Sequence, residues 1–97
     1  MLDQLQKDAF ADRVGTKVHL TLPDSAELEL TIHEVTALPQ HDGQTRPPFS
    51  VLFRGPEAPV LEQAIYSLGH SDLGTMELFL VPLGPKKSGF EYEAVFT

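Results

Sequence analysis

The sequence predicts an all-β domain with one short N-terminal helix, in which six antiparallel strands form a meander rolled into a small barrel or a strongly curved sheet. Apolar and polar residues alternate with a period of two along most of the chain after Gly15. Turn-forming segments separate the alternating runs at intervals of roughly 8–12 residues, which is typical of antiparallel sheets. No connecting segment is long and periodic enough for the helix that joins parallel strands. Rolling into a barrel would remove the exposed sheet edges.

One domain accounts for all 97 residues, with a helix over 3–14 and the β core over 16–97. The 14 acidic and 7 basic side chains give a net charge of −7, which disfavours nucleic acid as a partner because phosphate binding needs clustered positive charge. The longest apolar runs are far shorter than the roughly 20 residues that cross a bilayer, so no membrane partner is expected. The first residues lack the pattern of a secretory signal, which makes the cytoplasm the default location.

The expected helix over residues 3–14 has signals at both ends. Asp3 is placed to cap its N-terminus, and Gly15 is placed to end it. Because a helix of about ten residues is marginal alone in water, its apolar stripe must dock on an end or an outer patch of the barrel. The stripe consists of Leu5, Ala9, Phe10 and Val14.

Two alternating runs, 17–22 and 27–32, are expected to form the first hairpin, because turn chemistry at 23–26 separates them. Matching the apolar faces places Leu20 opposite Leu30.

The alternation changes after Ile32. The apolar set moves from even to odd positions there, which predicts a β-bulge near His33–Glu34. The remaining expected strands cover 49–53, 64–68, 76–83 and 90–96.

Arg54 is the main candidate for a site. It follows a strongly apolar strand, where a guanidinium usually needs a carboxylate or several carbonyl acceptors. Glu77 and Glu93, on strands with mixed outer faces, are the expected partners. Two interpretations stay open. Arg54 forms a structural ion pair that locks the strand end, or it receives an anion or a partner's carboxylate through its bidentate fork.

The polar loop 39–48 is the second candidate, because exposed loops often carry binding residues. His41, Asp42 and Arg46 are its candidate contact residues. A simple spacer is the alternative interpretation.

The sequence contains no recognisable catalytic, cofactor-binding or metal-binding constellation. A metal site needs three or four converging ligands, and the hairpin register places His19 opposite Thr31 rather than His33. There is neither a Gly-x-Ser-x-Gly elbow nor a phosphate-binding loop. The absence of cysteine excludes disulfides, thiolate metal sites and cysteine nucleophiles. We therefore expect no cofactor and no enzymatic activity.

Three segments resemble a known family. They are Leu52-Phe53-Arg54-Gly55-Pro56, the run 78–85 (LFLVPLGP) and the run 92–96 (YEAVF), and the resemblance extends to the opening helix with Phe10 and the Val14-Gly15 step. The chain is similar to a family of short bacterial proteins of about 100 residues whose function is unknown. Its members are often encoded beside phage-tail-collar-like proteins. The resemblance implies an accessory of a tail-derived assembly, and it implies no catalytic residues.

These observations favour a structural or protein-interaction domain that binds a protein partner through an exposed sheet edge or the 39–48 loop. A homo-oligomer formed through a sheet edge is a further option. The alternative is a small barrel that encloses an apolar ligand. The residues that would line such a space are Phe49, Phe53, Tyr66, Phe79, Tyr92 and Phe96.

Overall fold

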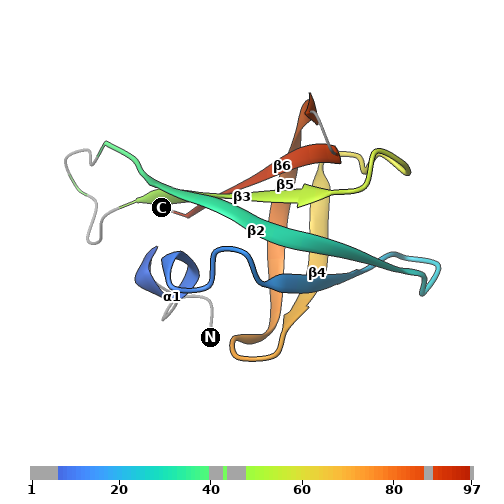
Figure 1. Cartoon of the computed structure of the whole chain (residues 1–97), viewed down its shortest axis with the longest axis horizontal. Helices are drawn as coiled ribbons and strands as arrows, with labels where there is room; N and C mark the ends of the chain where they lie inside the picture. The colour runs from blue at the N-terminus through green and yellow to red at the C-terminus, as the bar shows by residue number, and fades with distance from the viewer. Residues whose placement is uncertain (1–6, 40–42, 44–47, 87–88, 97) are drawn as a thin grey trace.

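The computed structural model describes residues 7–39, 43, 48–86 and 89–96 and confirms the expected fold class. The chain forms a closed antiparallel barrel of six strands with one short helix (Figure 1). The elements are α1 (Lys7–Ala11), β1 (Lys17–Thr21), β2 (Glu27–Ala37), β3 (Phe49–Gly55), β4 (Ala64–His70), β5 (Gly74–Lys86) and β6 (Gly89–Phe96).

The order of the strands around the barrel is β1-β2-β3-β6-β5-β4. The chain therefore runs as two three-stranded meanders, and not as the one continuous meander that the sequence predicts. The segment 56–63 between β3 and β4 is too long to force the two strands into a hairpin. Its Leu61 is buried, and the Leu61 N–H donates a hydrogen bond of 2.9 Å to the Tyr92 hydroxyl on β6. This contact holds the connection against the barrel while β6 takes the place beside β3.

The bulge expected near His33–Glu34 is confirmed. Along β2, Ile32 lies opposite Phe53, but Glu34 lies opposite Leu52, so His33 is the extra residue between them. The bulge places the His33 side chain beside Arg54 on the outer face of the barrel.

The expected hairpin register is wrong by two residues, since Leu20 lies opposite Leu28 and not Leu30. The turn is tighter than the alternation alone implies. Leu22 N–H donates to the Ala26 carbonyl at 2.8 Å, and Ser25 adopts a positive φ of 72°. A three-residue hairpin loop characteristically needs one residue in this left-handed region.

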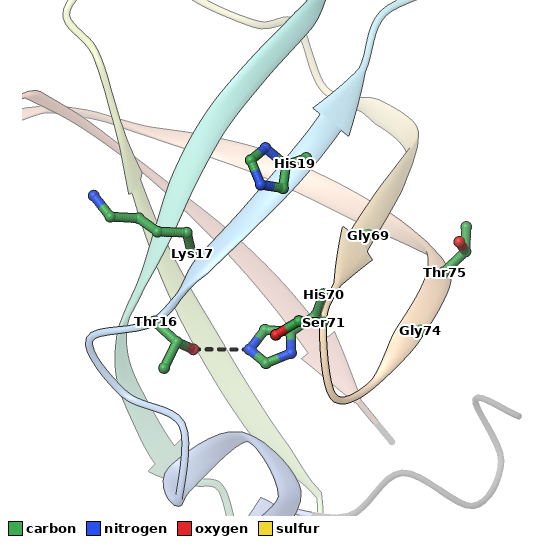
Figure 2. A pocket seen from close by; sticks show the side chains of 8 residues that line it. All are labelled: Thr16, Lys17, His19, Gly69, His70, Ser71, Gly74 and Thr75. Atoms are coloured by element: carbon green, nitrogen blue, oxygen red, sulfur yellow. Dashed lines mark hydrogen bonds between the residues drawn. The ribbon is translucent and has the colours of Figure 1, made fainter.

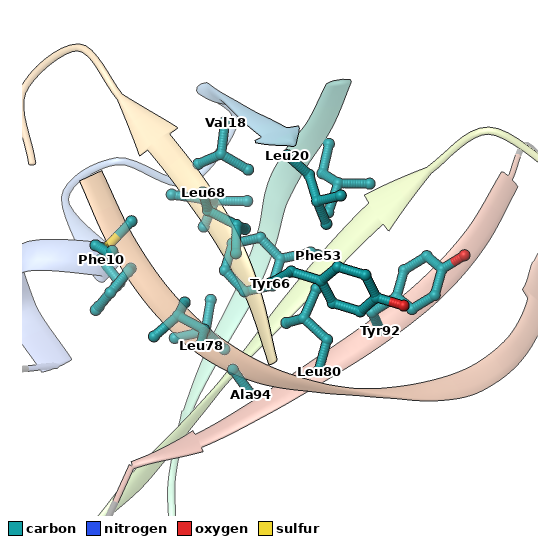
Figure 3. Packing of buried hydrophobic residues seen from close by; sticks show 14 of the residues in the cluster. Phe10, Val18, Leu20, Phe53, Tyr66, Leu68, Leu78, Leu80, Tyr92 and Ala94 are labelled. Atoms are coloured by element: carbon teal, nitrogen blue, oxygen red, sulfur yellow. The ribbon is translucent and has the colours of Figure 1, made fainter. Parts of the chain in front are cut away.

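Side chains that face into the barrel fill its interior (Figure 3). Aromatic rings close the end near α1, where the ring centre of Phe10 lies 6.0 Å from that of Phe49 and 5.2 Å from that of Phe96. The helix thus plugs an end of the barrel, which is one of the two placements that the sequence left open (Figure 1). The fully buried residues include Phe10, Val18, Leu20, Leu30, Ile32, Val51, Phe53, Leu68, Leu80 and Tyr92.

Two expectations about apolar residues are wrong. Val14 is exposed, because α1 ends at Ala11 and a turn follows it. Phe79, expected among the lining residues of an internal space, points outward from β5. Asp3 and Leu5 of the expected helix lie outside the described residues. Within those residues, no helix is long and apolar enough to span a bilayer.

Candidate functional site

Arg54 forms an ion pair with Glu91 on the outer face of the barrel. The two residues lie directly opposite each other on β3 and β6, and Arg54 Nη2 donates to Glu91 Oε2 at 2.7 Å. The Glu91 side chain is only 7% exposed, and that of Arg54 is 30% exposed. Burying a carboxylate is unfavourable without a partner, so the hydrogen-bonded ion pair with Arg54 compensates for the water that Glu91 loses.

The partner of Arg54 differs from both expected carboxylates. Glu93 is two residues further along β6 and lies opposite Leu52. Glu77 lies on β5, opposite Ser67 of β4, and β6 separates β5 from β3. The alternation placed Glu91 and Glu93 on the same face, but only the register between β3 and β6 selects one of them.

His33 completes this cluster. Its Nε2 lies 3.0 Å from Arg54 Nη2 and 3.7 Å from Glu91 Oε2. Because a guanidinium only donates hydrogen bonds, Nε2 accepts, and the proton of the neutral ring is on Nδ1. The Nη2 group of Arg54 therefore donates hydrogen bonds to two side chains of the protein itself. The Nε atom of Arg54 is buried and has no hydrogen-bond partner in the described part of the chain.

The surface beside Arg54 is a shallow depression of about 400 Å³. Lys17, Glu29 and Thr31 line it together with Arg54. Lys17 Nζ lies 3.6 Å from Glu29 Oε1, so both cations here have a carboxylate close by. This arrangement favours the structural-lock interpretation of Arg54 over an anion receptor.

A second depression, of about 520 Å³, lies between β1, the end of β4 and the start of β5 (Figure 2). Gly69 lacks a side chain there, and His19 and Thr75 flank it from the neighbouring strands. Most of its lining residues are polar, and two of them are histidines, the residue type that most often serves as a general acid or base.

The buried His70 in this depression is fully engaged in hydrogen bonds. Its Nδ1 accepts from the backbone N–H of Asp72 at 2.9 Å and from that of Leu73 at 3.3 Å. The proton of the ring therefore lies on Nε2, which donates to Thr16 Oγ1 at 2.8 Å (Figure 2). The Thr16 hydroxyl in turn donates to the Arg13 carbonyl at 2.6 Å. His70 thus ties the turn after β4 to the segment before β1, and neither nitrogen is available as a general base.

A third feature is an apolar stripe on the outside of the barrel, formed by Val60, Ile65, Phe79 and Val95. Ile65 on β4 and Phe79 on β5 lie directly opposite each other and are 67% and 49% exposed. Val95 lies on the outer face of the next strand, β6, and is 52% exposed. Exposed apolar side chains on three successive strands form a continuous feature, unlike the single ones that are common on protein surfaces.

The stripe continues into a hollow at the start of β4. The segment that precedes β4 lines this hollow of about 430 Å³, and Val60 and Ile65 belong to both features. Its apolar lining includes Leu22, Pro23, Val60 and Tyr66. This surface was not predicted from the sequence, although the outward positions of Ile65 and Phe79 follow from the alternation in their strands.

His41, Asp42 and Arg46 of the 39–48 loop lie outside the described residues. In the part of the chain that is described, no group of three or more histidines and carboxylates is placed to hold a metal ion.

The fold and these surfaces define a small closed β-barrel domain with a filled interior and an apolar stripe on its outer wall. The chain belongs to the family described as a domain of unknown function (DUF6916), whose model matches residues 5–96. No curated protein and no solved structure matches it.

Proposed function

We propose that this protein is a non-enzymatic interaction domain that binds another protein through the outer face of β4, β5 and β6. The exposed apolar stripe is the observation that carries this proposal, since Ile65 and Phe79 are exposed side by side on regular strands. Large exposed apolar groups on a rigid sheet are typical of surfaces that become buried in a complex.

The sheet face replaces the sheet edge that the sequence favoured. In the closed barrel, β1 pairs with β4, so the described strands offer no terminal strand to which a partner could add another one. A partner must therefore cover side chains on the outside of the barrel. Self-association through an edge would meet the same obstacle.

The engagement of His70 and Arg54 supports the non-enzymatic part of the proposal. Both ring nitrogens of His70 and the Nη2 group of Arg54 form hydrogen bonds within the fold. The resemblance to short bacterial proteins encoded beside phage-tail-collar-like proteins supports an accessory role in a tail-derived assembly. Within this proposal, the partner is a component of such an assembly.

Co-purification with the tail-collar-like product of a neighbouring gene tests the proposal. The tagged wild-type protein is compared with the double variant Ile65→Thr/Phe79→Thr, whose β-branched threonines suit a strand. Val14→Thr is the matched control, because Val14 is an exposed apolar residue outside the stripe. We expect the wild type and the control to retain the partner and the double variant to lose it, with urea unfolding midpoints that remain similar. Retention by the double variant, or no capture by the wild type, would contradict the proposal.

A further inference from the structure

We infer that the apolar stripe and its adjoining hollow accept a short, extended, positively charged segment of the partner, with one apolar side chain anchored in the hollow. This inference rests on the proposed function and adds the chemistry of the ligand. Three features carry it: the shape of the hollow, the carboxylates around the stripe and the distribution of basic residues along the chain.

The hollow provides the anchor site. Leu22 and Pro23, which follow β1, line it together with Val60 and Tyr66, and Ile65 joins it to the stripe. A concave apolar site that leads onto an exposed apolar stripe suits a peptide that inserts one side chain and lays the following ones across the sheet.

Carboxylates surround this surface. Glu62 lies at the hollow, Glu77 is two residues before Phe79 on β5, and Glu93 is two residues before Val95 on β6. Glu62 and Glu77 are exposed, and Glu93 is half-buried. The ion pairs among the described residues involve Asp72, Glu29 and Glu91, so they use none of these three.

Basic side chains are missing from this part of the chain. The sequence has no lysine or arginine from Glu57 to Pro85 or from Gly89 to Thr97, although these segments carry β4, β6 and nearly all of β5. The surface is therefore apolar at its centre and negative around it. Electrostatic complementarity selects a ligand with lysine or arginine on either side of apolar residues.

The same charge distribution argues against other occupants. A second copy of this chain would bring its own Glu77 and Glu93 against those of the first, and like charges at an interface are unfavourable. An anionic lipid surface would meet the same repulsion.

The dimensions set the length of the ligand. Crossing from β4 to β6 covers two interstrand spacings, or about 10 Å, which is about three extended residues. With an anchor residue and flanking charges, a segment of about seven residues covers the hollow and the stripe.

A fluorescently labelled probe peptide tests the inference by anisotropy. The probe alternates four lysines with leucine, valine and phenylalanine. One control peptide has glutamate for each lysine, and a second keeps the lysines but has serine for each apolar residue. We expect the probe to bind more tightly than both controls, and its affinity to fall as salt is raised.

Variants of the protein locate the site. The triple variant Glu62→Gln/Glu77→Gln/Glu93→Gln should weaken probe binding about tenfold, since three exposed charge pairs each contribute modestly. Ile65→Thr/Phe79→Thr should weaken it to a similar degree, whereas the matched control Glu29→Gln, on β2, should leave it unchanged.

Two outcomes would overturn the inference: equal binding of the probe and either control peptide, or unchanged binding to the triple variant. These failures are distinct from failure of the proposed function. If the probe does not bind but co-purification still depends on Ile65 and Phe79, the interaction domain stands and only the basic segment is wrong.

Discussion

Replacing Arg54 with methionine removes the partner of a buried carboxylate while keeping most of the aliphatic stem. Glu91 would remain in the fold with its Oε2 no longer 2.7 Å from a guanidinium. Breaking a fully buried ion pair typically costs about 3–5 kcal/mol, but water reaches the partly exposed Arg54 and reduces this value. We therefore expect Arg54→Met to lower the free energy of unfolding by about 2–3 kcal/mol.

Urea unfolding followed by circular dichroism measures this effect, and a double-mutant cycle assigns it to the pair. For a domain of this size the urea midpoint should fall by about 1–2 M. Glu91→Gln should also destabilise the protein, and the double variant should lose less than the sum of the two, with a coupling of about 1.5 kcal/mol or more.

The matched control is Lys17→Met, which breaks the exposed pair between Lys17 and Glu29. Exposed pairs contribute little, so the control should change stability by less than about 0.5 kcal/mol. An Arg54→Met midpoint equal to that of Lys17→Met, or a coupling near zero, would refute the structural lock. Wild-type stability combined with loss of the co-purifying partner would instead support Arg54 as a receptor.

Three further predictions concern the fold. Phe10→Ala should lower the free energy of unfolding by about 3–5 kcal/mol in the same urea assay, because the buried Phe10 ring plugs the barrel against Phe49 and Phe96. A change below about 1 kcal/mol, which is typical of a surface substitution, would show that the helix does not close the core. Burial, together with the charges of Glu62 and Tyr92, raises the pKa of Tyr66 above its usual 10.0. As the pH rises, the phenol of Tyr66 ionises first in the unfolded chain, so the free energy of unfolding should be intact below about pH 10 and fall as the pH rises through the raised pKa. Tyr66→Phe should make this fall less steep. An equally steep loss of stability in the variant would show that Tyr66 is not its cause. Thr16→Val should lower the free energy of unfolding by about 1–2 kcal/mol, because it leaves the buried His70 Nε2–H without its acceptor. The control Thr75→Val, at an exposed position of the same depression, should lower it much less. Equal effects of the two variants would argue against the hydrogen bond between His70 and Thr16.

The alternation of the sequence was enough to predict the antiparallel strands and the bulge, whereas the closed barrel was one of two forms that the sequence left open. The change from even to odd apolar positions after Ile32 has one simple structural solution, an extra residue, and His33 is that residue. By contrast, an error of two residues in a register leaves every side chain on its correct face. Leu20 is buried whether it lies opposite Leu28 or Leu30, and only the tight turn around Ser25 decides between them.

The same ambiguity explains why the partner of Arg54 was not predictable. Glu91 and Glu93 are on one face of one strand, and the choice between them depends on the pairing of β3 with β6, which are far apart in the sequence. The strand order was equally inaccessible, because a long connection such as 56–63 does not specify which strand follows it in the sheet. Local patterns determine faces and bulges, whereas long-range pairing determines the contacts at a site.

In our proposal, recognition takes place on the outer face of β4, β5 and β6, while the buried contacts of His70 and Arg54 maintain the fold. Backbone amide chemical-shift mapping of the isotopically labelled protein, during titration with the lysine-containing probe peptide, locates the recognition surface and so tests this proposal. The largest shifts should occur around Glu62, Ile65, Phe79 and Val95, and the amides near Arg54 and His70 should change little. Largest shifts in the depression between Lys17 and Thr75 would contradict it.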